Sequence, residues 1–182
     1  MKSMTRILFA CTLVSLACSV PAAELAQQPS TGSADMQRQR VAESTASIHQ
    51  HQLDFVAAPI KSASDLQAYL AMTPKAFSPF EKLSPGAKRR FIDGLVFNEN
   101  GLVGYDYSGL AAELSASDAY RLMSLFGAQR TVPLISGLRV EARQDAIVTE
   151  TSEMPMDDHV NYRCIGGHNC IYTGGMICMT GC

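Results

Sequence analysis

Four cysteines near the C-terminal end are the residues of this chain whose type and spacing could carry chemistry. Cys164, Cys170, Cys178 and Cys182 are separated by five, seven and three residues, in a stretch that also holds five glycines. An even cysteine count in an exported chain is typical of disulfides, because the extracytoplasmic space is oxidising and so short a segment cannot hold itself by apolar burial. We expect two disulfides, with all three pairings left open by the sequence.

The same thiols, with His168 and with His159 nearby, form an alternative zinc site. Structural zinc sites usually place paired ligands two to four residues apart, and only Cys178 and Cys182 approach that spacing. An oxidising compartment also competes for the thiolates. We therefore predict no metal and no other cofactor.

No catalytic motif is recognisable. Ser108 is preceded by Asp106 and followed by Leu110 at the two positions where a nucleophile elbow needs glycine. The sequence has no His-Glu-x-x-His helix, no phosphate-cradling glycine loop and no dinucleotide fingerprint. Glu99, Asp106 and Glu113 could meet in the fold, but solvation and capping are simpler roles for them. The sequence leaves the question of enzymatic activity open and favours its absence, with no catalytic residue assigned.

The first 23 residues have the layout of a secretory signal peptide. Lys2 and Arg6 precede an apolar run over residues 7–20, which is shorter than the roughly 20 residues that span a bilayer. The small residues that follow suit signal peptidase, and we place the cleavage after Ala23. The mature chain is predicted to be exported, to the periplasm or the exterior.

A lipid anchor at Cys18 is not expected. Ser15 stands where lipoprotein signals favour a branched aliphatic residue, and Leu16 stands where they favour a smaller one. Cys11 and Cys18 are therefore interpreted as apolar residues of the discarded segment. No later apolar stretch reaches bilayer length, so the mature chain is predicted to have no transmembrane segment. The net charge of −2 excludes the polycationic field of a nucleic-acid-binding protein.

The mature chain is predicted to have four successive parts. The first is polar and largely flexible, although Val41, Ile48 and Phe55, seven residues apart, could form a thin apolar stripe on a docking helix. His49 and His51 in this part are expected to be a solvated pair. The parts are a flexible segment (24–58), a small helical globular domain (59–143), a polar acidic linker (144–163) and a Cys/Gly-rich disulfide tail (164–182).

Cap signals mark short helices within the globular part. Ser64, with Gln67 three residues later, predicts a helix that ends before Pro74. Ser115 predicts the start of another helix, and Gly127 predicts its end. The apolar face of this helix is formed by Ala119, Leu122, Met123 and Phe126. This helix is expected to organise the core.

A third helix is expected to begin at Ser84, with Pro85 as its first residue. Its end is ambiguous. A hairpin turning at Asn100 and Gly101 competes with a longer helix that runs to Phe97, and we favour the longer helix because a two-stranded hairpin alone is only marginally stable. Residues 131–140, broken by proline and glycine, suit an extended segment. The predicted fold class is mainly α: a small bundle of short helices with at most a minor hairpin, plus a disulfide-stapled C-terminal tail.

These features favour an exported, non-enzymatic binding or interaction protein. Its apolar, Cys-rich tail would pack against the helical domain or against a partner protein. Two alternatives remain. One is a secreted precursor that is cut within residues 142–163 and releases a C-terminal Cys-rich peptide, a toxin or a signal. The other is a small exported enzyme whose site is assembled only in three dimensions.

Overall fold

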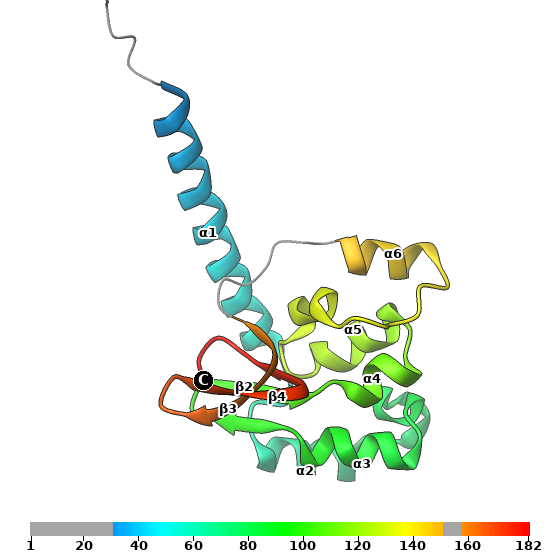
Figure 1. Cartoon of the computed structure of the whole chain (residues 1–182). Coiled ribbons are helices and arrows are strands. Elements are labelled where there is room, and N and C mark those ends of the chain that lie inside the picture. Colours follow the sequence, from blue (N-terminus) through cyan, green and yellow to red (C-terminus); the bar gives the residue numbers. More distant parts are fainter. Residues whose placement is uncertain (1–30, 151–157) are drawn as a thin grey trace, which may run out of the picture.

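The computed structural model of the chain describes residues 31–150 and 158–182 (Figure 1). Its helices are α1 (Thr31–Ala57), α2 (Ala63–Met72), α3 (Pro85–Asp93), α4 (Ser108–Glu113), α5 (Ala116–Ser124) and α6 (Arg143–Glu150). Short 3₁₀ turns are η1 (Lys75–Phe77), η2 (Pro79–Lys82) and η3 (Gln129–Leu134). The strands are β1 (Val96–Asn98), β2 (Gly101–Asp106), β3 (His159–Gly166) and β4 (Asn169–Cys178). The predicted leader, with its cleavage after Ala23 and with Cys11 and Cys18, lies outside the described residues.

The prediction of a mainly α fold is wrong, because the strands form a four-stranded antiparallel sheet in the order β1-β2-β4-β3. The C-terminal segment expected to be a stapled tail is the hairpin β3–β4. Strand β4 lies inside the sheet, where Tyr105 of β2 is opposite Ile177. The sheet lies beside the helices α2 to α5, and the fold is mixed α and β (Figure 1).

The longer of the two predicted versions of α3 is also wrong. The helix ends at Asp93, and the Gly94 amide donates to the Arg90 carbonyl at 2.9 Å. A Cβ on Gly94 would lie 2.6 Å from the Asp106 Cβ, so the chain can leave the helix this close to β2 only with glycine here. The hairpin β1–β2 forms because it is not alone: β2 pairs with β4, which adds the further strands that an isolated hairpin lacks.

Two of the predicted helix caps are confirmed. The Ser84 Oγ accepts a hydrogen bond from the Ala87 amide at 3.3 Å, and the Ser115 Oγ accepts one from the Asp118 amide at 3.2 Å. The helix before Pro74 is present but begins earlier than expected, with Ser62 in place of Ser64 as its N-cap. Of residues 131–140, the first four belong to η3 and are not extended.

The main core lies between the helices and one face of the sheet, and it is rich in aromatic rings. Phe126, which follows α5, packs edge-to-face against both Phe80 and Phe91 at ring distances of 6.2 and 6.0 Å. Tyr105 of β2 is fully buried, and its hydroxyl lies 2.6 Å from the Thr131 Oγ1. Burial raises the pKa of Tyr105 well above its usual value, so the phenol stays neutral.

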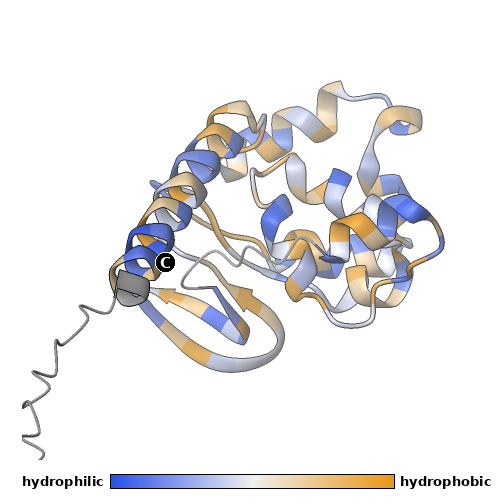
Figure 2. Ribbon diagram, turned by 90° about the horizontal axis from the view of Figure 1, so that it is seen from above, coloured by the Kyte–Doolittle hydropathy of each residue, from blue (hydrophilic) through white to orange (hydrophobic). Residues whose placement is uncertain are grey.

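Helix α1 occupies most of the segment expected to be flexible, and it projects away from the rest of the molecule (Figure 1). Most of its residues are hydrophilic, as the ribbon colours show (Figure 2). Its C-terminal end is anchored: the Arg130 Nε donates to the Asp54 Oδ2 at 2.8 Å. Gly101 and Gly127, both with positive φ, leave no room for a Cβ beside the Phe55 ring and the Asp54 carbonyl. These close approaches fix the helix end on the body.

Helix α6 lies in the segment expected to be a linker, and a buried carboxylate attaches it to α5. Asp145 accepts the Ser117 amide at 2.7 Å on Oδ1, and the amides of Glu141 and Ala142 at 3.0 and 2.8 Å on Oδ2. The hydrogen bonds from Ser117, followed by those from Glu141 and Ala142, hold the pKa of Asp145 well below its usual range. The charged carboxylate therefore joins the starts of two helices.

Candidate functional site

A groove of about 770 Å³ separates the C-terminal half of α1 from the edge of the body. One wall is α1 and the other is built from the β1–β2 turn, the end of α5 and the loop after β4. Its apolar lining comes from both walls: Ile48, Phe55, Val56, Leu102, Phe126 and Met179. Its apolar character is typical of a ligand-binding site.

The helical wall follows from the spacing of apolar residues along α1. Ile48 and Phe55 are seven residues apart, which is two helical turns, so both face the same side. Phe55 contacts the body at Gly101, while Ile48 lies beyond the last anchoring contact and remains half exposed above the groove. Val41, two further turns out, does not line this groove. Of the apolar stripe Val41, Ile48 and Phe55, the last two residues therefore form the helical wall of the groove.

Polar groups gather in the same groove. His51, Asn100, Thr180 and Glu99 line it, and no Lys or Arg stands among its described lining residues. The His51 Nε2 is buried and has no hydrogen-bond partner within the part of the chain that the structure describes. His49, expected to share its solvated setting, is exposed, so the structure separates the two histidines. Because this nitrogen is buried, the polar groups that a ligand in the groove could pair with are those of the other lining residues, Glu99, Asn100 and Thr180.

Asp158 lies behind this polar lining. Its Oδ1 accepts the Thr180 amide at 2.6 Å and the Thr180 hydroxyl at 3.0 Å. Its buried Oδ2 has no partner among the described residues. Desolvation raises the pKa of Asp158, although the Thr180 hydrogen bonds and the nearby His51 and His159 act in the opposite direction. The carboxyl group holds the loop that carries Thr180.

The β1–β2 turn is tied to the loop after β4. The Asn98 and Asn100 side-chain amides both donate to the Gly181 carbonyl, at 2.8 and 3.3 Å. Because these bonds join two wall segments that are far apart in the sequence, the body side of the groove is held by more than apolar packing.

Two further hollows, of about 320 and 500 Å³, lie on the outer part of α1. Within the described part of the chain, their lining residues all lie between Ala34 and Ser44 of that one helix. Because these residues supply only one wall, we assign no site there.

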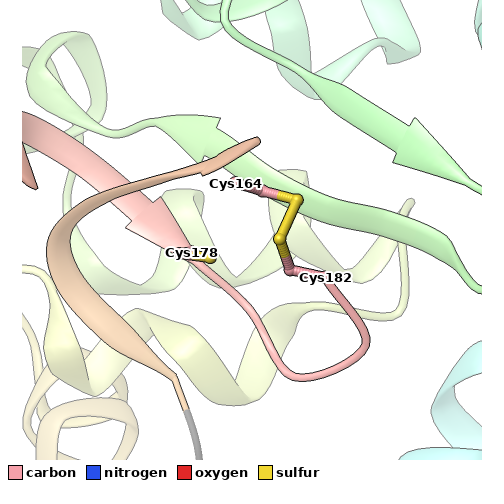
Figure 3. A group of neighbouring side chains, drawn as sticks. All are labelled: Cys164, Cys178 and Cys182. Atoms are coloured by element: carbon pink, nitrogen blue, oxygen red, sulfur yellow. A yellow bond between two sulfur atoms is a disulfide. The ribbon is translucent and has the colours of Figure 1, made fainter. Parts of the chain in front are cut away.

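The cysteines form disulfides, as their even number predicted, and the structure decides the pairing: Cys164 with Cys182, and Cys170 with Cys178. Figure 3 shows the first bond with Cys178 beside it. Together with Val103, the buried cysteines form a small core separate from the main one. A bulge in β2 places Val103 there, because the register passes from Gly104 to Leu102 between two successive residues of β1.

The sulfurs of Cys164, Cys178 and Cys182 all lie within 4.8 Å of one another. Because Cys164 is bonded to Cys182 and Cys178 is bonded to Cys170, these sulfurs present no thiolate that could bind a metal. His168 and His159, the other candidate ligands, have exposed side chains.

The three carboxylates considered as a catalytic group have separate surroundings. Glu99 lines the groove. The Asp106 Oδ1 accepts the Ser108 amide at 2.8 Å, and Glu113 accepts the Ser84 amide and hydroxyl at 2.6 and 2.7 Å. The hydrogen bonds from Ser84 lower the pKa of Glu113. Sequence reasoning missed the groove itself, for which the seven-residue apolar spacing was the only signal.

Comparison with known proteins gives no relative: no protein-family model, no curated protein and no solved structure matches this chain. Among residues 31–150 and 158–182, no helix combines the length and the apolar character needed to cross a bilayer. The function must therefore be argued from the groove and its residues.

Proposed function

We propose that this chain is an exported binding protein without catalytic activity, and that its groove holds a small apolar molecule with a neutral or cationic polar head. The observation that carries the proposal is the groove of about 770 Å³ between α1 and the body. Its volume falls in the range of roughly 300 to 1,000 Å³ that is typical of small-molecule sites.

The lining residues determine the class of ligand. Apolar side chains from both walls favour a hydrocarbon or aromatic body. Glu99 is the acidic lining residue and no basic residue balances it within the described lining, so an anionic head is disfavoured. The polar lining residues Glu99, Asn100 and Thr180 favour a head that can form hydrogen bonds.

Export is part of the proposal. Its supports are the signal-peptide layout of the first residues and the two intramolecular disulfides, which are compatible with an oxidising compartment.

The precursor alternative has less support than the binding protein. Cleavage before Cys164 would separate β4 from its partner β2 and remove the fully buried Ile177 from the main core. A surface for a protein partner remains on the β3–β4 hairpin, where Tyr162, Ile165, Ile171 and Tyr172 are exposed. The groove is favoured over this surface because it is concave and has two walls.

The test uses a neutral apolar fluorophore, N-phenyl-1-naphthylamine, with an anionic naphthalenesulfonate as the charge control. The matched variants are Ile48→Gln, in the wall, and Val41→Gln, outside it. The two side chains are 51% and 61% exposed on the same helix, so neither change should destabilise the fold. A ligand that covers the exposed half of Ile48 gains about 1 kcal/mol from it, which predicts about five-fold weaker binding of the neutral probe to Ile48→Gln.

Val41→Gln should bind the probe as the unchanged protein does, and the anionic probe should bind more weakly than the neutral one. Equal affinities for the two variants, or no saturable binding of the neutral probe, would remove the groove from consideration as the site.

A further inference from the structure

The two disulfides lie close to each other, and three of their four sulfurs form one group. The Cys178 Sγ lies within 4.8 Å of both sulfurs of the Cys164–Cys182 bond, and it is itself bonded to the Cys170 Sγ. The Cys182 Sγ also lies 3.2 Å from the Asn169 carbonyl oxygen, which places it next to Cys170. The Cys178 sulfur therefore lies beside the Cys164–Cys182 bond (Figure 3).

We propose that these sulfurs form a thiol–disulfide exchange site, in which an external thiolate enters at Cys170 and the released Cys178 thiolate transfers the exchange to the buried Cys164–Cys182 bond. The chemical class of substrate is a thiol, small or carried by a protein. The site is separate from the groove and does not depend on the function proposed for it.

Accessibility sets the direction of entry. Cys170 is half-buried, whereas Cys164, Cys178 and Cys182 are buried. An external thiolate therefore reaches the Cys170 sulfur first and displaces the sulfur of Cys178. The leaving thiolate is produced inside the small core, beside the second disulfide.

The exchange proceeds in three balanced steps with no net oxidation or reduction. The external thiolate bonds to the Cys170 sulfur, the bond to Cys178 breaks, and Cys178 leaves as a thiolate. That thiolate bonds to the Cys164 sulfur and Cys182 leaves as a thiolate. Finally, the Cys182 thiolate bonds to the Cys170 sulfur and releases the external thiolate. The product is a second pairing, Cys164 with Cys178 and Cys170 with Cys182.

Chain entropy barely distinguishes the two pairings. The pairing present joins residues 18 and 8 positions apart. The second pairing would join residues 14 and 12 positions apart, from 164 to 178 and from 170 to 182. Because the loop-closure penalty depends on the logarithm of loop length, the two totals are nearly equal. The populations should then be decided by packing within the small core.

The backbone keeps the sulfurs together while a bond is open. Ile177, next to Cys178, is fully buried in the main core, and the Met179 amide donates to the Val103 carbonyl at 2.8 Å. The His168 amide donates to the Cys182 carbonyl at 3.0 Å, which holds the end of the chain against the β3–β4 turn. A released thiolate therefore stays within reach of the second disulfide.

The test is the variant Cys170→Ser, which leaves three of the four C-terminal cysteines and needs no external thiol. The oxidised protein is incubated at several pH values, quenched with acid and alkylated, and its free thiol and its disulfide are located by mass mapping. We expect the pairings Cys164–Cys182 and Cys164–Cys178 to be populated within about tenfold of each other, because their loop lengths are similar. The exchange rate should rise about tenfold per pH unit below the thiol pKa.

A second variant, Cys164→Ser, tests the reverse direction, since its Cys182 thiol should exchange with the Cys170–Cys178 bond. The double variant Cys170→Ser/Cys178→Ser keeps one disulfide and serves as the control for folding, measured by circular dichroism. If the free thiol stays at one position in both single variants while the fold is retained, the proposal is overturned. It is also overturned if glutathione forms no mixed disulfide at Cys170 of the unchanged protein.

Discussion

A shielded ion pair contributes to the attachment of α1 to the body, and this leads to a sharp prediction for the variant Arg130→Gln. The Arg130 Nε lies 2.8 Å from the Asp54 Oδ2, with side chains only 24% and 11% exposed. The same helix carries a matched control, Arg38, which lies 2.9 Å from Asp35 with side chains 79% and 65% exposed. The two pairs have similar geometry and differ in their contact with water.

The difference in exposure determines the expected magnitude. A hydrogen bond to a charged group that is shielded from water contributes about 1.5 to 3 kcal/mol, whereas an exposed ion pair contributes about 0 to 1 kcal/mol. Taking about 2 kcal/mol for the Arg130 pair, the ratio of docked to undocked α1 should fall about thirty-fold in Arg130→Gln. The variant Arg38→Gln should change this ratio by less than about three-fold.

Amide hydrogen exchange over residues 48–57 measures how firmly α1 is docked on the body. The affinity for the neutral apolar probe measures whether the groove keeps both of its walls. Arg130→Gln should lower both the protection of these amides and the probe affinity, while exchange in the sheet stays slow. Equal protection of residues 48–57 in Arg130→Gln and Arg38→Gln would refute the argument that this pair holds the helix.

Three further predictions concern stability. Phe126→Ala should lower the free energy of unfolding, measured by urea titration, by about 3 to 5 kcal/mol, because the ring is buried among other rings. The control Phe77→Ala, at a position that is 80% exposed, should change this free energy by less than about 0.5 kcal/mol. Replacing both Cys164 and Cys182 by Ser should cost about 3 kcal/mol, since their bond closes a loop of 18 residues; an unchanged urea midpoint would contradict this. Because hydrogen bonds lower the pKa of Asp145, its stabilisation is complete above the ordinary aspartate pKa of about 3.9 and is lost as the pH falls through the lowered folded value. Asp145→Asn should therefore unfold more easily at neutral pH and show a flatter acid dependence, and parallel curves for the two proteins would disprove the role of this carboxylate.

Local signals in the sequence identified the features that depend on neighbours within a few residues. Ser84 and Ser115 were recognised as helix caps because a cap bonds an amide three residues ahead, and both bonds are present. Disulfide bonding followed from the even cysteine count. The sequence favours a longer helix over the β1–β2 hairpin, because two strands alone are only marginally stable. This preference is wrong because β4, some seventy positions later in the chain, pairs with β2.

The groove was beyond sequence reasoning for a similar reason. Ile48 and Phe55 were noted as a stripe, but the opposite wall comes from Leu102, Phe126 and Met179, which are far apart in the chain. Nothing in the local pattern shows that these residues meet, since their approach depends on the sheet order and on the glycines that admit α1.

The amino-acid sequence by itself determined the helix starts in the centre of the chain and the presence of disulfides, because both depend on local spacing and residue type. Only the tertiary structure decided which cysteines pair, that β4 enters the sheet, and that α1 stands against the body to enclose a groove. These features depend on contacts between segments that are distant in the sequence. The free energy of such contacts comes from packing and burial in the folded chain, so no periodic pattern in the sequence predicts them.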